Sequence, residues 1–323
     1  MVVPFVAPVP VFVGIPVVLL IDPVTGIDPQ IFLRRQHHKT FLVHDHRLFG
    51  DAERTAGQHK AENQQQNGQK DRKTLNEYTQ QQNLEVNREN YLQFLQKGML
   101  PELFHLQTDE VCRNYVSAIK DTVMLRDIVQ RYKVKDALLL DELFRYVVNN
   151  SGRLFSVSNI VNYFKSQGRK TNYETVSSYL SYLCKAFLIH RVERYSIAGK
   201  ELLSGNCKYY SNDLAYYNYL YRGFSYGLGG LLENAVYLEL RRHGWQVYVG
   251  VQGQLEVDFV AMRGENKLYV QVSWQMAGDE QTALREYAPL LNIKDQFRKV
   301  VVTLDEVRFP NNNGVEHLFP WEL

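Results

Sequence analysis

The apolar positions between residues 231 and 275 change from helical spacing to strand spacing. The stretch LLENAVYLELRRHG repeats apolar residues three and four positions apart and predicts a helix, whereas WQVYVG, LEVDFVAM and KLYVQVSW predict three strands. Glu233 lies on the same helical stripe as Val236 and Leu240, because residues three, four and seven apart share one face. We therefore expect the Glu233 carboxylate to face inward.

Spacing also assigns the polar residues of the strands to faces, because successive side chains alternate. In EVDFV, Asp258 lies opposite its two apolar neighbours, and in YVQVSW, Gln271 and Ser273 lie together. One face of the predicted sheet thus collects these three residues. A helix over residues 279–291 and a strand over 299–303 complete an α-β-β-β-α-β order.

Three further helices are predicted upstream. The first covers Leu138–Asn149 and the second Ser156–Phe164. The third opens at residues 171–174, where Thr171 and Glu174 have the spacing of a capping box.

A β hairpin follows these helices. It consists of the runs LIHRVERYSI and CKYYS, with a turn at Gly199-Lys200. Three helices and a hairpin are the parts of a winged helix, a form that places a helix in the DNA major groove. With Val176, Leu180, Leu183 and Phe187 buried, the outward and basic positions are the candidate DNA contacts. They are Arg169, Lys170, Thr175, Ser178, Tyr182, Lys185, Arg191, Arg194 and Lys200.

Charge in this segment favours an anionic partner. Between Ser151 and Lys208, nine Lys or Arg residues outnumber three acids, in a chain whose net charge is only +2. Such a local excess suits phosphate groups. The alternative is a solvated face of a winged helix that contacts another protein.

Residues 1–82 follow neither pattern. The first 21 are apolar, but Pro4, Pro8, Pro10 and Pro16 interrupt any helix, at about 3 kcal/mol each in a helix interior. No basic region precedes this run, as it would in a signal peptide. We expect an extended segment and no membrane anchor.

The same region holds a histidine cluster and a polar stretch. His37, His38, His44 and His46 are four of the nine histidines, but without a cysteine or an i, i+4 histidine pair a zinc site is disfavoured. Residues 56–82 are rich in glutamine and almost free of apolar anchors, which predicts a linker.

Nucleotide chemistry and disulfides are both disfavoured. The only stretch approaching a phosphate-binding loop is GQKDRKT, in which Arg72 replaces the second glycine and no apolar strand precedes it, so we expect no ATP hydrolysis. The three cysteines, Cys112, Cys184 and Cys207, are too few and too scattered for a disulfide framework. A reducing cytoplasm is the expected compartment.

The motifs, in their order, resemble a known family. LLENAVYLEL, VYVG, EVDFVA, YVQVSW and DEQTALREYAPLLNIKDQFRKVVVTLDE are similar to the C-terminal module (DUF 4143) of a prokaryotic AAA-type ATPase family. The resemblance extends from Tyr91 to Glu306 and includes FLQKGMLPEL and CKYYSNDLAYYN. It implies a winged helix and a nuclease-like fold of the PD-(D/E)xK type. Residues 1 to about 75 do not resemble the ATPase domain of that family.

The resemblance also shows which catalytic groups are missing. Nucleases of this type hold Mg²⁺ with carboxylates and use a lysine near the attacking water. Gln271 stands in the place of an acid, and Ser273 in the place of the lysine. Glu233 and Asp258 remain as candidate Mg²⁺ ligands, and Arg285 is the candidate for the missing positive charge.

The sequence therefore predicts an α+β protein. Its parts are an atypical segment (1–82), a helical connector (83–137), a winged helix (138–212), a restriction-endonuclease-like α/β domain (213–309) and a loose tail (310–323). The predicted function is noncatalytic DNA binding in the cytoplasm. A weak Mg²⁺-dependent nuclease and a protein-interaction module are the alternatives.

Overall fold

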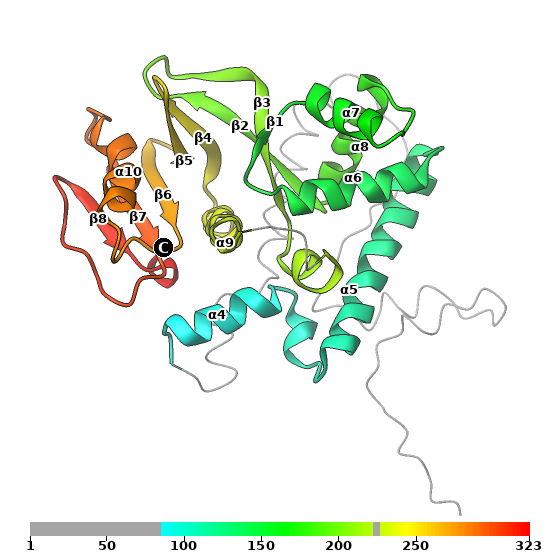
Figure 1. The fold of residues 1–323 in the computed structure, drawn as a ribbon, viewed down its shortest axis with the longest axis horizontal. Helices are drawn as coiled ribbons and strands as arrows, with labels where there is room; N and C mark the ends of the chain where they lie inside the picture. Colours follow the sequence, from blue (N-terminus) through cyan, green and yellow to red (C-terminus); the bar gives the residue numbers. More distant parts are fainter. Residues whose placement is uncertain (1–84, 222–226) are drawn as a thin grey trace, which may run out of the picture. The chain divides into compact units, whose positions relative to one another are not determined.

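A computed structural model describes residues 85–221 and 227–323, which belong to one compact unit (Figure 1). The expectations for residues 1–82, including the apolar run, the histidine cluster and the GQKDRKT stretch, lie outside the described residues.

One mixed sheet of eight strands organises the described chain, so the α+β class is confirmed. Its order is β1-β3-β2-β4-β5-β6-β7-β8, with parallel pairing for β2–β4, β6–β7 and β7–β8 and antiparallel pairing elsewhere. The strands are β1 (Leu154–Phe155), β2 (Ile189–Ser196), β3 (Glu201–Ser211), β4 (Gln246–Gln252), β5 (Leu255–Arg263), β6 (Asn266–Ser273), β7 (Arg298–Thr303) and β8 (Val315–Leu318).

The helices follow the expected periodicity closely. They are α4 (Arg88–Lys97), α5 (Asp109–Val123), α6 (Ala137–Asn149), α7 (Val157–Ser166), α8 (Tyr173–Lys185), α9 (Leu228–Arg242) and α10 (Glu280–Leu291). A π-helical stretch, Met124–Gln130, extends α5, and another, Tyr216–Tyr221, follows β3. The predicted α-β-β-β-α-β order is confirmed as α9-β4-β5-β6-α10-β7.

Side-chain caps set the starts of α7 and α8. Ser156 accepts a hydrogen bond from the Asn159 amide at 3.1 Å. At α8, Asn172 accepts from the Thr175 amide at 2.8 Å, so the cap is Asn172 and the expected Thr171 capping box is wrong. Asn binds a free helical amide as well as Thr does, and its use here starts the helix one residue later.

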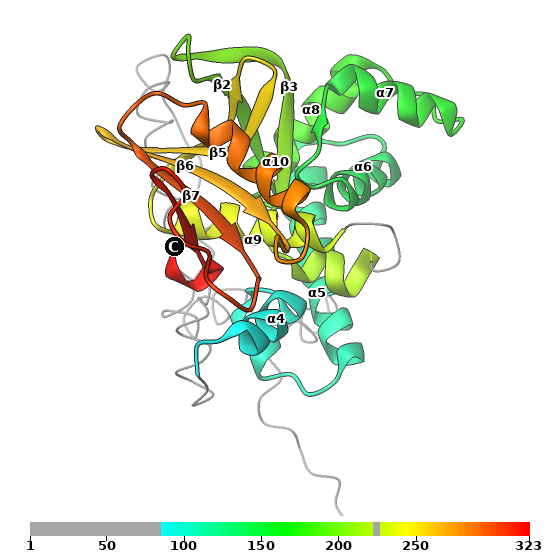
Figure 2. The same cartoon turned by 60° about the vertical axis from the view of Figure 1, so that its left-hand side comes forward.

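Helices α9 and α10 cover opposite faces of the sheet (Figure 2). The buried side chains of α9, such as Val236, join the larger core, which includes Phe259 and Val270. Those of α10, such as Leu290, join a smaller core with Tyr269. Neighbouring residues of β6 thus enter different cores, as strand alternation requires.

The β2–β3 hairpin is part of this sheet. β2 pairs in parallel with β4 at Arg194, Tyr195 and Ser196. β3 lies between β2 and β1 and pairs with both. One sheet therefore runs across the predicted boundary at residue 212.

The expectation of a loose C-terminal tail is wrong. β8 pairs in parallel with β7, and Val315 and His317 are buried. Beyond β8, the Trp321 ring lies 5.7 Å from that of Tyr91 on α4. The apolar residues of the tail contribute enough burial to order a segment that local patterning alone does not mark as a strand.

The described part of the tyrosine-rich segment after β3, up to Tyr221, packs against α6. Tyr216 and Tyr221 are buried and meet the Phe144 ring edge to face at 5.3 and 6.1 Å.

None of the helices in the described ranges is long and apolar enough to span a membrane.

Candidate functional site

Lys208 on β3 brings three carboxylates together. Its Nζ lies 2.9 Å from Glu233 Oε1 on α9, 2.8 Å from Glu256 Oε1 and 3.6 Å from Asp258 Oδ1 on β5. Only 4% of the Lys208 side chain is exposed. We call these four residues the Lys208 cluster.

Two neighbours hold Glu233 in place. Tyr210 lies two residues after Lys208 on the same face of β3, and its hydroxyl donates to Glu233 Oε1 at 2.6 Å. Gly152, with φ of +77°, approaches from the turn after α6, where an added Cβ would stand 3.2 Å from both carboxylate oxygens. Glycine therefore suits this position both for its backbone conformation and for the close approach.

A β-bulge decides the direction of Asp258. Tyr248 pairs with Val260 but Gly250 with Val257, so Val249 opposes two residues, Asp258 and Phe259. A bulge of this kind interrupts the alternation of side chains. Asp258 consequently approaches Lys208, and its Oδ2 accepts from the Val272 amide at 2.8 Å.

The expectation that one face collects Asp258, Gln271 and Ser273 is therefore wrong. Gln271 accepts from the Asp258 amide at 3.3 Å, but its own amide donates to Glu286 on α10 at 2.9 Å. Asp258 and Gln271 thus reach toward different helices. The Ser273 hydroxyl hydrogen-bonds the Gln275 carbonyl at 3.4 Å.

Arg285 does not reach the cluster. Its side chain is 73% exposed and pairs with Glu286 at 3.1 Å. The positive charge expected from this helix comes instead from Lys208, which the sequence pattern places among the basic residues of the predicted winged helix. The alternation of Lys208 and Tyr210 in CKYYS was the available signal, because it places both side chains on one face.

Burial dominates the protonation of the cluster. Burial and the Glu233 charge raise the pKa of Asp258 to about 8, against the opposing effect of Lys208. Burial alone would lower the pKa of Lys208, but the three carboxylates outweigh it and raise that pKa. Lys208 therefore stays charged at neutral pH while Asp258 holds a proton for much of the time.

The cluster does not suit a magnesium ion. Mg²⁺ requires oxygen ligands around an open position, and the position between Glu233, Glu256 and Asp258 is taken by the Lys208 ammonium. Within residues 85–221 and 227–323, no three His, Cys, Asp or Glu side chains are placed to hold a metal.

The predicted DNA contacts occupy several different environments. Arg169 pairs with Glu142 at 2.7 Å, and Arg191 pairs with Glu193 at 3.1 Å, so internal acids partly neutralise both. Arg194 is half-buried within β2.

The residues predicted on α8 lie on its outer side. Thr175, Ser178 and Tyr182 are half-buried and Lys185 is exposed, as is Lys170 in the turn before the helix. The final candidate, Lys200, is exposed in the β2–β3 turn. Because β2 runs away from the end of α8, this turn lies roughly 25 Å from that end.

Tyr182 packs against a residue outside the predicted winged helix. Its ring stacks on Tyr132, with centroids 3.9 Å apart and planes at 3°. Arg131 and Lys185 lie 5.6 and 5.9 Å from the Tyr132 ring. The end of the helical connector thus joins the surface of α8, a contact that the sequence pattern did not indicate.

Comparisons with known proteins give a family match without a function. Residues 88–226 match the model of a domain of unknown function (DUF8612), which covers α4 to β3 and includes Lys208. The match does not test the resemblance to DUF 4143, which stays a prediction.

Two curated relatives are also uncharacterized proteins. One from Haemophilus influenzae is 33% identical over 232 residues, which are 71% of this chain and 56% of the relative. One from Methanocaldococcus jannaschii is 28% identical over 188 residues, 57% of this chain and 42% of the relative. The chain thus spans about half the length of these relatives. No solved structure matches.

Proposed function

We propose that this chain is a noncatalytic DNA-binding module. In this proposal α6, α7 and α8 with the β2–β3 hairpin act as a winged helix, and the part from α9 to β7 is a degenerate nuclease-like domain. The observation that carries the proposal is the set of exposed cations around α8. They are Arg131, Lys133, Lys135, Lys170 and Lys185.

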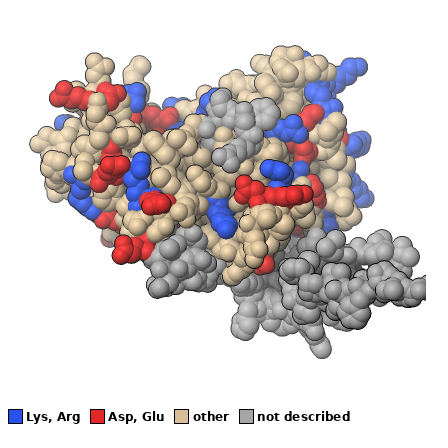
Figure 3. Space-filling model, turned by 60° about the horizontal axis from the view of Figure 1, so that its bottom comes forward, with Lys and Arg blue, Asp and Glu red and all other residues tan. Residues whose placement is uncertain are grey.

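The position of these cations supports contact with phosphates. Lys and Arg side chains gather on the side of the molecule formed by α5 to α8, on the right in Figure 3. Arg131 and Lys185 are neighbours because both lie within 6 Å of the Tyr132 ring. Phosphate contacts of this kind supply most of the affinity of a protein for nonspecific duplex DNA.

The outward face of α8 fits between such contacts. Ser177 and Ser178 are half-buried and Ser181 is exposed, and all three are short and uncharged. Short polar side chains let a helix approach the bases in the major groove, while cations at its flanks contact phosphates and fix its position. Glu174 is the exposed acid at the start of α8, where the helix dipole favours a negative charge.

The absence of catalysis in this proposal follows from the Lys208 cluster. The Lys208 ammonium occupies the position between the carboxylates in which a divalent cation would otherwise bind. The cluster then acts as a link between β3, α9 and β5. An ion pair of this kind is expensive to break, because removing one partner leaves buried charge.

A salt series tests the proposal. Fluorescence anisotropy of the full chain with a 25-base-pair duplex, from 50 to 200 mM salt, measures the slope of log affinity against log salt. Five phosphate contacts predict a slope of about −4.5 and a roughly 500-fold loss over this fourfold range. Replacing Lys133, Lys135 and Lys185 with Gln should reduce the slope by about 2.7.

The control removes the same charge elsewhere. Arg263, Arg285 and Lys294 are exposed and lie on β5, on α10 and after α10. Their replacement with Gln should change affinity less than threefold. Equal losses in the two triple variants, or binding that ignores salt, would refute a specific role for α8 and favour the protein-interaction alternative.

A weak nuclease is the second candidate, because the cluster has one observation in its favour. Two acids, Glu233 and Asp258, lie beside Lys208. Carboxylates and a lysine are the residue types that metal-assisted hydrolysis requires. The same DNA, incubated with Mg²⁺ or Mn²⁺, should then be nicked by the wild type and not by Asp258→Asn. Intact DNA in both samples favours the noncatalytic proposal.

A further inference from the structure

Two helical segments end beside each other at the Tyr132–Tyr182 pair. The π-helical extension of α5 reaches Gln130, just before Tyr132, and α8 ends at Lys185, just after Tyr182. The two rings are parallel, with centroids 3.9 Å apart and planes at 3°, so their faces are in van der Waals contact. Among the residues that the structure describes, Tyr182 is the only ring stacked on Tyr132. The opposite face of the Tyr132 ring therefore has no aromatic neighbour there.

Two lysines accompany the stacked rings. Lys185 Nζ lies 5.9 Å from the centroid of the Tyr132 ring, and Lys133 follows Tyr132 directly. Both lysines are exposed, and neither forms an ion pair with an acid within residues 85–221 and 227–323. An aromatic face beside two available ammonium groups suits a ligand that carries both a flat ring and negative charge.

The backbone at Lys133 is strained. Its φ of +51° lies in the left-handed region, where glycine is the usual residue after a helix. The turn is closed by the Val134 amide, which donates to the Val129 carbonyl at 3.1 Å. A Cβ at such a position crowds the following carbonyl oxygen. Lys133 thus combines an exposed charge next to Tyr132 with backbone strain, and strain of this kind clusters at functional sites.

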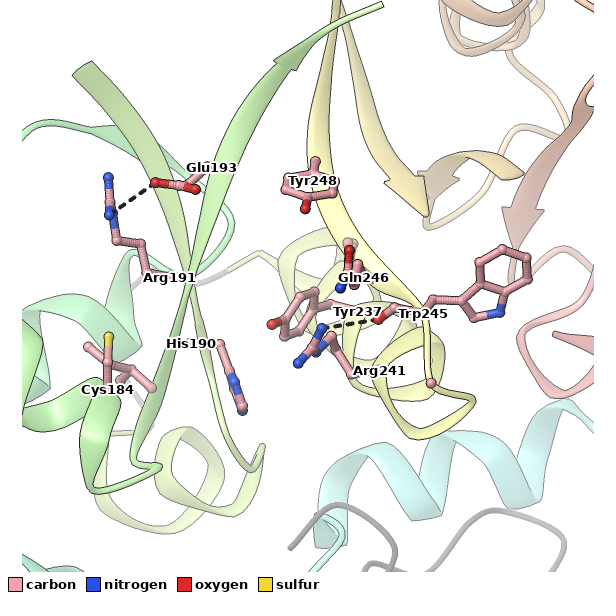
Figure 4. A pocket seen from close by; sticks show the side chains of 12 residues that line it. Cys184, His190, Arg191, Glu193, Tyr237, Arg241, Trp245, Gln246 and Tyr248 are labelled. Atoms are coloured by element: carbon pink, nitrogen blue, oxygen red, sulfur yellow. Dashed lines mark hydrogen bonds and ion pairs between the residues drawn. The ribbon is translucent and has the colours of Figure 1, made fainter. Parts of the chain in front are cut away.

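A hollow between β2 and β4 is the other candidate for a flat ligand, but its ring is already covered. The two strands pair at three positions and diverge toward their amino ends around a cavity of about 340 Å³. Tyr237, which lines this cavity, is 3% exposed, and the Tyr210 ring is stacked on it at 4.5 Å. Arg241 donates to the Trp245 carbonyl at 3.1 Å, as Figure 4 shows. The ring and this guanidinium therefore have partners within the protein.

We propose that the Tyr132–Tyr182 pair receives an unpaired base at the end of a DNA duplex, an inference that rests on the proposed function. In this arrangement α8 holds the duplex, and the first unpaired base packs on the open face of the Tyr132 ring. The phosphates of the single strand contact Lys133 and Lys185. Every base has a π face, so bases of any sequence can stack in this way, and each contributes roughly 5–150-fold in affinity. The preferred ligand is thus duplex DNA with a single-stranded extension.

Fluorescence anisotropy of the full chain compares DNAs that carry the same number of nucleotides. One is a 25-base-pair duplex with a six-nucleotide single-stranded extension, made in both polarities, and the other is a 28-base-pair blunt duplex. We expect the better of the two extended DNAs to bind at least fivefold tighter than the blunt duplex at 100 mM salt. Because the number of nucleotides is matched, the difference measures the contribution of the unpaired bases.

Variants of the ring connect this preference to the stacked pair. Tyr132→Leu should remove the preference for the extension and change the affinity for blunt duplex less than twofold. Tyr132→Phe retains the ring and should keep the preference. Tyr195→Leu is the matched control and should bind both DNAs as the wild type does, because Tyr195 is also half-buried, with a ring at 6.0 Å and a lysine at 5.4 Å.

Replacement of Lys133 with Gly separates binding from stability. The variant relieves the left-handed strain, and this gain exceeds the added freedom of glycine in the unfolded chain, so the melting temperature should rise by roughly 1–4 °C. The same variant should bind the extended DNA at least threefold more weakly. A lysine that served only the fold would not give a more stable variant with weaker binding.

The outcomes distinguish this inference from the proposed function. Salt-dependent binding of the extended and blunt DNAs with equal affinity would overturn the inference and leave the proposed function intact. A preference for the extension that persists in Tyr132→Leu and in Lys133→Gly would do the same, because the unpaired bases would then lie elsewhere. Absence of binding to every DNA would overturn both.

Discussion

Replacing Lys208 with Met tests directly whether charge holds the Lys208 cluster together. Methionine keeps most of the length of the side chain and its apolar contacts but removes the ammonium group. Glu233, Glu256 and Asp258 would then face one another without a cation, and the exposed fractions of their side chains are 16, 37 and 13%.

The expected loss is large because the charges are buried. Removing one partner of a buried ion pair costs about 3–5 kcal/mol. For a chain of this size, each kcal/mol lowers the melting temperature by roughly 2–4 °C, so Lys208→Met should melt roughly 6–20 °C below the wild type at pH 7.5. The exposed end of Glu256 places the result toward the lower half of this range.

Chemical denaturation across pH distinguishes lost charge from lost packing. Carboxylic acids are protonated below about pH 4, so repulsion within the cluster disappears there. The difference between Lys208→Met and the wild type should therefore shrink as the pH falls from 7.5 to 4. Lys200→Met, an exposed lysine on the same hairpin, is the matched control and should match the wild type at every pH.

A double replacement gives the result that would refute this reasoning. If Lys208 compensates the charge of Glu233, then Glu233→Gln should recover much of the stability of Lys208→Met, because a neutral amide leaves no uncompensated buried charge at that position. A loss below about 1 kcal/mol in Lys208→Met, or a loss that does not depend on pH, would show that the cluster is not held by charge.

Three further predictions concern neighbouring features. Gly152→Ala should destabilise the fold by about 1–2 kcal/mol more than Gly168→Ala in denaturant melts, because both glycines have φ of +77° but only Gly152 approaches Glu233. Burial and Glu233 raise the pKa of Asp258 to about 8, so the folded state holds a proton that the unfolded state loses near pH 4, and stability falls as pH rises between these values. The stability of Asp258→Asn relative to the wild type should therefore increase by at least about 1.4 kcal/mol from pH 4 to pH 8 in the same assay. A stability difference that does not change with pH would contradict the raised pKa of Asp258. Burial lowers the pKa of His317 below 6.5, so wild-type stability should fall as pH drops through 6.5, and His317→Gln should reduce that dependence in melts from pH 7.5 to 5.

Much of the fold could be predicted because its causes are local. The apolar stripes of α6, α7 and α8 lie within single helices, and caps such as Ser156 act on amides two or three residues away. The alternation in β4, β5 and β6 likewise belongs to each strand. The order from α9 to β7 followed from these local patterns.

The candidate site was only partly predictable, because its geometry depends on distant parts of the chain. The inward position of Glu233 followed from its helical stripe. The direction of Asp258 did not, because a bulge arises from the pairing of β5 with β4 and has no signature in the residues EVDFV. A search for positive charge near the carboxylates in the sequence led to Arg285, which lies outside the cluster.

The amino-acid sequence by itself determined which segments form helices and strands and which of their faces are apolar. Only the tertiary structure decided that Lys208 enters the carboxylate cluster, that Tyr132 covers Tyr182, and that β2 and β4 diverge around a hollow. The physical reason is the range of the interactions. Hydrogen-bonded turns and side-chain periodicity act over a few residues, whereas ion pairs, ring stacking and strand register join residues that are brought together only by folding.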